Sequence, residues 1–398
     1  MQHCTFWGNL MEKIEKQAKQ NSTTTQDKPM VISIRAKGLN SGSGFFVKEN
    51  LIATNIHCVV GTTSVSAKLS ATNTDYAIIG IAAFDAKNDL AILAVEGQGI
   101  PYPIGDSDLV VKGEIVKAIG CPYGEYMTTD GAFHSTLNNG QWLRIKAKFE
   151  EGYSGGPLLN SKGQVIGTNV GSEDYYSRAI SANILKELLY QTHKIEPLAQ
   201  WQEKDPIKAY IYLVHSKTKM KNKDYLGAIE DLNETLQLNP ALITAYHNQG
   251  AAKTLLAKSK YEKGNFAASQ RFCQSAIDDY NNIIRMHKDY TAYNNLADAK
   301  LHLAKTEARM GNIQKSQVLL QDALTDINFA IGQNKNNPIE DPDIALCYHT
   351  RGEIKEAMDD LNGAIEDFKE ARKNNEYTKD SEVSVDLERV KHALENTQ

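Results

Sequence analysis

The sequence is short of cysteine and of clustered histidine, and both shortages exclude common kinds of site. Its five cysteines are scattered without a CxxC pair, so neither a disulfide framework nor a cysteine zinc site is expected. The histidines form no HExxH motif or similar cluster. We therefore predict free thiols, no metal and no cofactor. The cysteines are Cys4, Cys58, Cys121, Cys273 and Cys347.

Strong net charge and long apolar runs are also missing. Lysine and arginine number 44 against 49 aspartates and glutamates, a formal net charge of -5, which favours neither nucleic acid nor an anionic membrane as a partner. No stretch approaches the roughly 18 consecutive apolar residues of a membrane span. Residues 1–17 lack the apolar core of a secretory signal peptide. We expect a soluble, cytoplasmic protein whose oligomeric state the sequence does not indicate.

The chain of 398 residues is long enough for two or three domains, and its pattern changes along its length. Residues 1–29 are mostly polar and are predicted to form an arm and a linker. Residues 30–195 contain short apolar runs broken by glycine, such as VISIRA, LIATNI and LAILAV. These runs indicate the many short strands of a β-barrel or sandwich. The predicted fold class is therefore multidomain, an all-β part followed by an all-α part.

The all-α part, residues 205–375, contains about four repeats. In each repeat a tyrosine is followed four residues later by a small residue, and a second signature of the type AIEDL follows downstream. The first two tyrosines, at 212 and 246, are 34 residues apart, which is the period of tetratricopeptide (TPR) repeats. The pairs are Tyr212 and Ser216, Tyr246 and Gly250, Tyr293 and Ala297, and Tyr348 and Gly352.

Spacing within the repeats predicts the lengths of the helical hairpins. The small residue and the alanine of the second signature are 12 residues apart in repeats one and four and 26 apart in repeats two and three. The difference, 26 minus 12, is 14 residues, which adds about two turns to each helix and keeps the packing faces in phase. We expect the middle two hairpins to be elongated, with the tyrosines in the core. Residues 379–398 are predicted to form a capping helix.

Three residues of the β part have the chemistry of a nucleophilic hydrolase. His57 follows the run LIATNI, Asp89 precedes LAILAV, and Ser154 lies in EEGYSGGPLLN. Taken singly, each is more often structural, since a glycine-flanked serine is commonly a turn residue. Together they have the order His, Asp, Ser of chymotrypsin. They predict a catalytic set, because a serine hydroxyl needs an imidazole base that a carboxylate orients.

Residues 30–192 resemble the trypsin-like serine proteases of the HtrA/Deg type. The resemblance is carried, in this order, by GSGFFV, LIATNIHCVV, FDAKNDLAIL, GDSDLVVKGEIVKAIGCPYG and EGYSGGPLLNSKGQVIG. It implies a double six-stranded barrel with the site between the barrels. In that site His57 would be the general base, Asp89 the residue that orients it and Ser154 the nucleophile.

The resemblance also implies which groups hold the substrate. The backbone N–H groups of Gly152 and Ser154 map onto the family's oxyanion hole. Segment 121–141 is a candidate regulatory loop, because HtrA-type enzymes often form the oxyanion hole only on binding. A further strand matches the edge that pairs with an extended substrate by β-addition. This strand comprises Tyr176, Ser177, Arg178, Ala179 and Ile180.

The sequence departs from the family at three points. Tyr153 stands where secreted trypsins have the aspartate that pairs with a new N-terminus, so activation by N-terminal clipping is not expected. Cys58 lacks the partner cysteine of secreted trypsins. TPR-like repeats take the place of the PDZ domain that is common behind HtrA catalytic domains.

Two functions from different classes stay open. The first is a cytoplasmic serine endopeptidase that cleaves proteins, with the concave face of the repeats binding a protein partner or substrate and regulating cleavage. A protease fused to repeats would suit a bacterial stress or defence pathway, although no residue of the sequence identifies the activating signal. The alternative is a catalytically silent adaptor in which Tyr153 locks the serine turn and the repeats form an interaction scaffold. Retention of His57 and Ser154 favours the enzyme.

Overall fold

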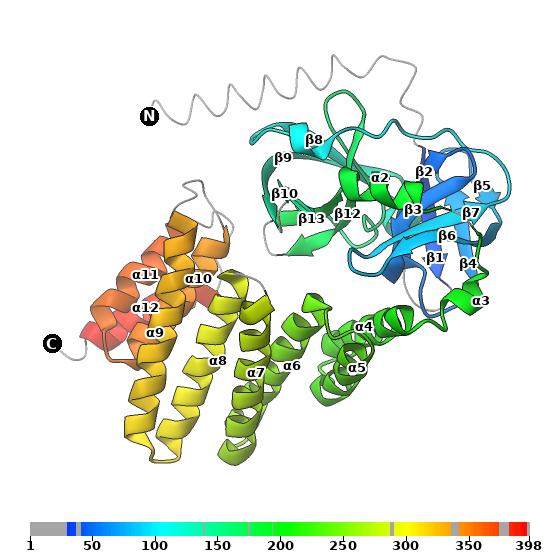
Figure 1. Cartoon of the computed structure of the whole chain (residues 1–398). Helices are drawn as coiled ribbons and strands as arrows, with labels where there is room; N and C mark the ends of the chain where they lie inside the picture. The colour runs from blue at the N-terminus through cyan, green and yellow to red at the C-terminus, as the bar shows by residue number, and fades with distance from the viewer. Residues whose placement is uncertain are drawn as a thin grey trace, which may run out of the picture.

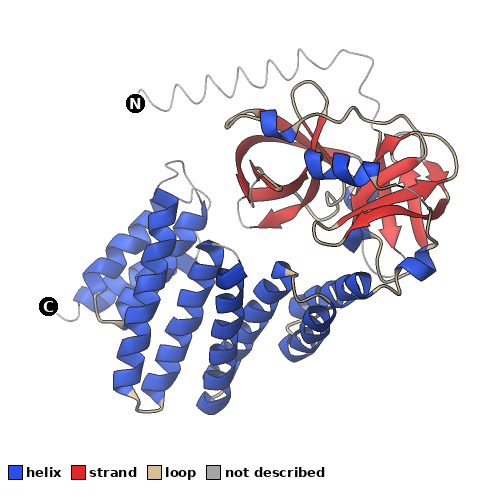
Figure 2. Ribbon diagram, viewed as in Figure 1, coloured by secondary structure: helices blue, strands red, loops and turns tan. Residues whose placement is uncertain are grey.

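The chain folds into an all-β domain followed by an all-α region (Figure 1, Figure 2). This order confirms the predicted fold class. The computed structural model describes residues 30–36, 41–137, 140–173, 176–192, 194–286, 290–335, 342–373 and 382–395. The arm predicted for residues 1–29, with Cys4, lies outside these ranges.

The first sheet has seven strands in the order β5-β4-β1-β2-β3-β7-β6. Only Ala77 separates β5 from β6, so one stretch of chain borders both edges of the sheet and curls it towards a barrel. The resemblance implied six strands, and the bend at Ala77 accounts for the seventh. The strands are β1 (Val31–Ala36), β2 (Ser41–Lys48), β3 (Leu51–Asn55), β4 (Val65–Leu69), β5 (Thr74–Tyr76), β6 (Ile78–Asp85) and β7 (Leu90–Val95).

The second sheet is a closed six-stranded barrel in the order β10-β13-β12-β11-β8-β9. Its strands are β8 (Ile115–Gly120), β9 (Met127–Leu137), β10 (Trp142–Lys146), β11 (Pro157–Leu159), β12 (Val165–Glu173) and β13 (Tyr176–Ser181). Helix α2 (Ala182–Tyr190) follows β13 and begins at Ser181, whose hydroxyl accepts from the Asn183 N–H and caps the helix.

The two barrels share an apolar layer. The strand runs LIATN of β3 and LAILAV of β7 are buried along their whole length, as expected for strands covered on both faces. One cluster joins side chains of the first barrel, such as Phe45 and Ile92, to Val165 and Ile180 of the second and to Leu188 of α2. This layer fixes the barrels against each other and so fixes the groups that lie at their junction.

Helical hairpins build the second half of the chain (Figure 1). The hairpins that the spacing predicts to be long have helices of 20 and 21 residues and of 20 and 23 residues. The first has 17 and 14, and the fourth 16 and 13. The helices are α3 (Leu198–Trp201), α4 (Asp205–Lys221), α5 (Tyr225–Leu238), α6 (Ile243–Glu262), α7 (Phe266–Met286), α8 (Tyr290–Arg309), α9 (Ile313–Lys335), α10 (Pro342–Ala357), α11 (Leu361–Lys373) and α12 (Glu382–Glu395).

In the two repeats whose small residue is glycine, that residue makes room for a large side chain of the second signature. A Cβ atom at Gly250 would lie 2.6 Å from the ring of Tyr280, and one at Gly352 would lie 2.5 Å from the ring of Phe368. The two rings belong to the signatures AIDDY and AIEDF. The repeated spacing therefore records the close approach of the two helices of a hairpin.

Each hairpin also carries an ion pair at equivalent positions. A lysine three residues after the small residue contacts the last acidic residue of the second signature in all four repeats. Sequence reasoning missed these lysines, although their fixed spacing from the small residue was a readable signal. The pairs, with their N–O distances, are Lys219–Asp231 at 2.8 Å, Lys253–Asp279 at 2.7 Å, Lys300–Asp326 at 2.6 Å and Lys355–Asp367 at 2.8 Å.

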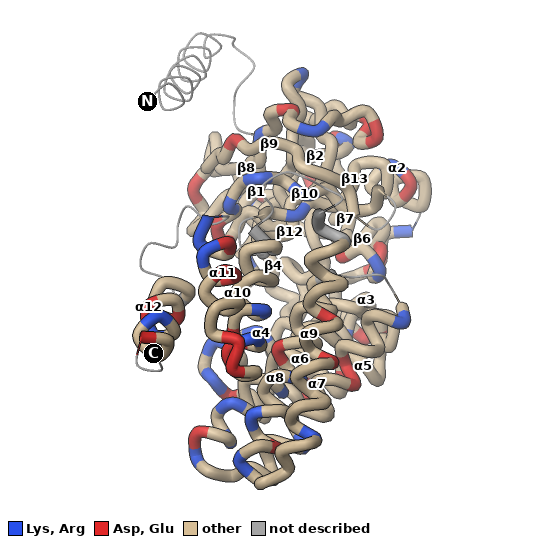
Figure 3. The backbone as a smooth tube through the Cα atoms, turned by 90° about the vertical axis from the view of Figure 1, so that its left-hand side faces the viewer, with Lys and Arg blue, Asp and Glu red and all other residues tan. Residues whose placement is uncertain are grey.

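Lysine and arginine residues are interspersed with aspartate and glutamate residues along the helices (Figure 3). None of the described helices combines the length and the apolar character of a membrane span.

Burial differs among the repeated ion pairs, and it sets the cost of breaking one. Lys253→Met should destabilise the helical region by about 3–5 kcal/mol, because it leaves the buried Asp279 carboxylate unpaired. Burial raises the pKa of Asp279 to about 6, although Lys253 opposes the shift. In the folded variant Asp279 therefore binds a proton at pH values at which the unfolded chain has already lost it. Protonation removes the unpaired charge, so the loss of stability should be larger at pH 8 than at pH 5. Thermal unfolding followed by far-UV circular dichroism measures it.

Lys219→Met is the matched control. The two carboxylates are similarly buried, but the Lys219 side chain is 37% exposed against 11% for Lys253, so water already screens the Lys219 pair and its loss should be smaller. Adding Asp279→Leu to Lys253→Met should recover most of the stability. Equal losses in the two single variants would contradict a cost set by burial.

Candidate active site

His57 lies at the junction of the barrels, directly after β3. The chain turns there through the short helix η1 (Ile56–Cys58), whose Ile56 and Cys58 side chains are buried in the core of the first barrel. These two anchors fix the backbone on either side of His57. The imidazole is left 16% exposed, so it can meet a solvent-borne reactant.

Asp89 holds His57 through both of its carboxylate oxygens. Oδ2 lies 2.5 Å from Nδ1 of His57, and Oδ1 accepts from the backbone N–H of His57 at 3.1 Å. The Asp89 carbonyl in turn accepts from Asn55 Nδ2 at 2.9 Å and from the Ile56 N–H at 3.1 Å. The predicted histidine and aspartate are therefore brought together, and the imidazole ring is fixed in one orientation.

The backbone of Asp89 is strained. Its φ is +55°, in the left-handed region that costs most L-residues roughly 1–2 kcal/mol. Aspartate tolerates this region better than most residues because its short side chain can bond locally. Such conformations persist when their surroundings over-determine them, and they concentrate at functional sites.

The pKa of His57 is set by two opposed effects. Burial of the ring is the largest single effect and lowers the pKa, but the charge and hydrogen bond of Asp89, together with the contribution of Cys58, outweigh it, so the pKa lies well above the ordinary histidine value. An imidazolium formed at this position is therefore stabilised by Asp89.

Ser154 approaches the same junction through its backbone. Its carbonyl accepts from the Ser43 N–H at 2.7 Å and from the Cys58 thiol at 3.5 Å. Ser154 is therefore fixed beside the residue that follows His57. The hydroxyl donates to the Val170 carbonyl at 2.5 Å. The glycines around the serine have a steric cause, because a Cβ atom at Gly155 would lie 2.1 Å from the Ser43 carbonyl oxygen.

The turn before Ser154 needs glycine at position 152. Gly152 has φ of +107°, and the Tyr153 N–H closes the turn on the Glu150 carbonyl at 3.2 Å. A Cβ atom at Gly152 would lie 2.6 Å from Cα of Pro122. The Ser43 hydroxyl donates to the Gly152 carbonyl at 2.6 Å and accepts from the Cys121 N–H at 2.8 Å. Ser43 thus ties the turn to both barrels. Sequence reasoning missed this role, although Ser43 lies within the quoted motif GSGFFV.

Tyr153 anchors the same turn inside the second barrel. Its side chain is fully buried and stacks on Phe149 with a centroid distance of 5.7 Å and an interplanar angle of 15°. Its hydroxyl lies 2.9 Å from the Thr129 hydroxyl. The aromatic ring therefore belongs to the core of the second barrel and anchors the turn that carries Ser154.

Strand β13 requires a correction. Residues 176–180 were predicted to offer a free edge to a substrate strand, but β13 pairs with β10 on one side and with β12 on the other. Closure of the barrel pairs Ser177, Arg178, Ala179 and Ile180 on both sides and Tyr176 on its β12 side, so this strand lacks the free edge that β-addition needs. On its β11 side, β12 is bonded as far as Asn169, and the register with β13 shifts between Asn169 and Gly171. The Val170 carbonyl, which takes the Ser154 hydroxyl, lies at this shift.

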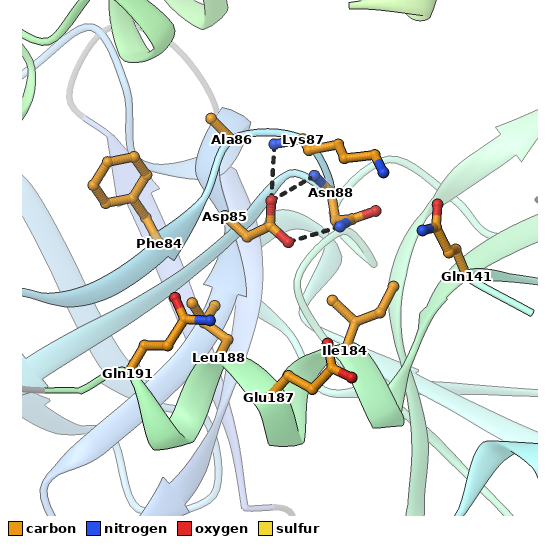
Figure 4. A pocket seen from close by; sticks show the side chains of 10 residues that line it. All are labelled: Phe84, Asp85, Ala86, Lys87, Asn88, Gln141, Ile184, Glu187, Leu188 and Gln191. Atoms are coloured by element: carbon orange, nitrogen blue, oxygen red, sulfur yellow. Dashed lines mark hydrogen bonds between the residues drawn. The ribbon is translucent and has the colours of Figure 1, made fainter.

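A cavity of about 450 Å³ lies behind the Asp89 turn, between that turn and α2 (Figure 4). Asp85 holds the turn by accepting from the N–H groups of Lys87 and Asn88 and from Asn88 Nδ2 at 2.6 Å. None of His57, Asp89 and Ser154 lines the cavity. Its walls are Phe84, Asp85, Ala86, Lys87, Asn88, Gln141, Ile184, Glu187, Leu188 and Gln191.

Cys58, Cys121 and Cys273 are buried thiols that form no disulfide in the described part of the chain. Cys58 is among them, beside Ser154. Within the described ranges, no group of three or more histidine, cysteine, aspartate or glutamate side chains is arranged to hold a metal ion.

A seven-stranded sheet curled towards a barrel and a closed six-stranded barrel, with a His–Asp pair and a glycine-flanked serine at their junction, form the arrangement expected of a trypsin-like peptidase domain. Comparison with known proteins agrees, since residues 42–167 match the family described as a trypsin-like peptidase domain. This part of the chain is related to the DegP and HtrA proteases.

Individual relatives cover the same part of the chain. A probable periplasmic serine endoprotease, DegP-like, from Pseudomonas putida is 35% identical over 138 residues, which are 32% of this chain and 28% of that protein. The putative serine protease HhoB from Synechocystis is 34% identical over 143 residues, 32% of this chain and 34% of that protein. The match therefore spans about a third or less of these relatives. The active form of the Rv3671c protease from M. tuberculosis is 23% identical, with a TM-score of 0.40 over 45% of this chain and 87% of that chain.

Asp89→Asn should lower the pKa of His57. The substitution removes the charge that raises the pKa and leaves burial, which lowers it, as the main effect. Asparagine also tolerates the left-handed backbone, so the turn should persist. Titration of the His57 ring by nitrogen-15 NMR measures the shift. Asp386→Asn is the control, because Asp386 lies 2.9 Å from His349 in the helical region and its loss should leave His57 unchanged. An unchanged His57 pKa in Asp89→Asn would contradict this account.

Proposed function

We propose that this protein is a serine endopeptidase that cleaves protein substrates through an acyl-enzyme, and that its helices form a TPR array that regulates cleavage. The proposal rests on the His57–Asp89 contact of 2.5 Å at the barrel junction, with Ser154 fixed beside the adjacent Cys58. Acyl transfer requires at least a nucleophile on a rigid turn, a base that accepts its proton and a charged group that orients this base.

In the proposed reaction, the Ser154 hydroxyl first leaves the Val170 carbonyl and turns to His57. Its oxygen attacks the scissile carbonyl carbon while the imidazole takes its proton, and the Asp89 charge stabilises the imidazolium. The N–H groups of Gly152 and Ser154 receive the oxyanion. The imidazolium then gives its proton to the leaving amine as the C–N bond breaks. A water molecule, activated by His57, hydrolyses the ester and frees Ser154.

The Val170 carbonyl and the neighbouring backbone of β12 are the proposed docking edge for the substrate. When the Ser154 hydroxyl turns away, this carbonyl can accept an N–H from an extended peptide. The bond from the Ser154 hydroxyl places this carbonyl beside the serine turn, whereas β13 is paired with β10 and β12. Main-chain pairing of this kind binds peptides of many sequences, and the pockets beside it select among them.

For the helices, the TPR proposal rests on the tyrosine and small-residue spacing and on the packing that this spacing produces. The concave face would bind a protein partner or substrate. We place the activity in the cytoplasm, and its support is that Cys58, Cys121 and Cys273 are buried thiols outside any disulfide. A role in a bacterial stress or defence pathway is part of the same proposal.

The adaptor alternative has one observation in its favour. The Ser154 hydroxyl donates to Val170, a contact in which it is not poised for proton transfer to His57. A silent module would keep this arrangement permanently. An enzyme would leave it when a substrate or partner binds, so activity in the presence of cell extract separates the two.

Ser154→Ala should abolish labelling by a fluorophosphonate, because the probe reacts with an activated serine hydroxyl. The matched control is Ser135→Ala, since Ser135 also contacts a histidine, with 3.0 Å between its Oγ and Nδ1 of His134. Labelling should survive in Ser135→Ala. The readout is in-gel fluorescence of the purified full chain, with and without cell extract. Equal labelling of Ser154→Ala and the wild type would remove Ser154 from its role, and silence of the wild type in both conditions would favour the adaptor.

Gly152→Ala should reduce turnover of a fluorogenic peptide by about a hundredfold to a thousandfold, the usual cost of losing an oxyanion donor. The added methyl meets Pro122 at 2.6 Å and must displace the turn. Gly163→Ala is the control for backbone strain alone. Gly163 also has a positive φ, of +72°, but its added methyl group would face open space and meet no neighbour. Gly163→Ala should lose a little stability and keep its turnover. Comparable turnover of both variants would argue against an oxyanion role for the Gly152 turn.

A further inference from the structure

The helical region begins against the catalytic junction. A single apolar cluster joins α3 and α4 to η1 and the residues after it, and it includes Trp201, Tyr210 and Leu213 of the helices together with Ile56 and Val59 of the barrel. Trp201 also packs edge-on against Phe84 of β6, with ring centroids 6.0 Å apart. The segment that carries His57 is therefore part of a core that the two halves of the chain build together.

Polar contacts fasten the same junction on both sides of α3. Glu196 exchanges two backbone hydrogen bonds with Ile81 of β6, each of 2.8 Å. The Gln202 side chain accepts from the Gly61 N–H at 3.1 Å and donates to the Thr62 carbonyl at 2.6 Å. Gln202 is 8% exposed, so both bonds are shielded from water. The backbone just after His57 is thus held by the first residues of the helical region.

Tyr210 of α4 holds the turn that leads to Asp89. Its hydroxyl donates to the Ala86 carbonyl at 3.0 Å, and the residue is 3% exposed. Burial raises its pKa, and the charges of Asp89 and Asp85 raise it further, in keeping with their closeness. Asp89 is left-handed at φ of +55° and depends on its surroundings for that conformation. Tyr210 supplies one of those constraints from outside the barrel.

The other end of α4 reaches the serine turn. Nζ of Lys221 lies 3.2 Å from Oε1 of Glu151, the residue before Gly152. Eleven residues separate Tyr210 from Lys221, about 16 Å along a helix at 1.5 Å per residue. Helix α4 therefore contacts the aspartate turn near one end and the turn of the nucleophile at the other.

We infer that Tyr210 is a positioning residue for Asp89, which makes the first long helix of the helical region an integral part of the peptidase site. The inference rests on the proposed function for its catalytic consequence. Without the Tyr210 hydroxyl, the Ala86 carbonyl is buried without this donor, and the turn that sets Asp89 loosens. A displacement of Asp89 weakens its hold on His57. A partner that shifts α4 would act on the site by the same route.

Tyr210→Phe tests the inference, because it removes one oxygen and keeps the ring in the core. Tyr212→Phe is the matched control, since position 212 points away from position 210 by about 200° around the helix. The pKa of His57, measured by ring NMR in the full chain, should fall in Tyr210→Phe and stay at the wild-type value in Tyr212→Phe. For peptide hydrolysis, normalised by fluorophosphonate titration of active sites, we expect kcat to fall about tenfold to a hundredfold with little change in KM. The acid limb of the pH profile should move to lower pH.

The outcomes distinguish a failure of the positioning role of Tyr210 from a failure of the proposed protease function. If the wild type hydrolyses peptide and Tyr210→Phe has the same kcat and the same His57 pKa, the positioning role is wrong and the protease function stands. If the wild type neither labels nor hydrolyses, the proposed function fails, and the NMR titration still decides whether Tyr210 acts on the His57–Asp89 pair. A Tyr210→Phe chain that does not fold, judged by circular dichroism, would overturn the inference, because the hydroxyl would then serve the fold as a whole.

Discussion

The contact between Asp89 and His57 depends on a backbone conformation that aspartate adopts only under constraint. Both carboxylate oxygens reach His57 because φ at Asp89 is +55°, and bonds from Asn55 and Ile56 to its carbonyl help to hold that value. The constraint has a cost of roughly 1–2 kcal/mol, which the packed barrel and the helices around the turn must supply. The arrangement of η1, the 85–88 turn and α4 can be understood as the means by which that conformation is kept.

The serine turn is stabilised differently, by glycine geometry and by core burial. Gly152 and Gly155 allow the chain to pass close to Pro122 and to the Ser43 carbonyl, where any side chain would collide. Tyr153 between them is fully buried against Phe149, so the turn has a rigid base in the second barrel. A buried aromatic ring at this position provides an anchor that needs no charged N-terminus.

The helical region uses a simple rule in each repeat. In repeats two and four a glycine on the first helix admits the aromatic ring of the second helix, and in all four repeats a lysine one turn later reaches the aspartate of the second signature. The ion pair and the aromatic contact lie in the same hairpin, so each hairpin sets its own helix spacing. Longer helices in the middle hairpins keep this rule because about two added turns return each side chain to its original face.

The sequence alone determined the order of the domains, the identity of the three candidate catalytic residues and the lengths of the hairpins, because strand runs, motif order and helical period are local patterns. It could not place groups whose position depends on pairing across the fold. The strand at 176–180 looked like an edge until closure of the second barrel paired both its sides. Ser43, Tyr210 and the Ser154–Val170 bond emerged only from contacts between residues far apart in the chain. Tertiary structure decided them, because a hydrogen bond depends on distances of a few tenths of an ångström that no sequence spacing records.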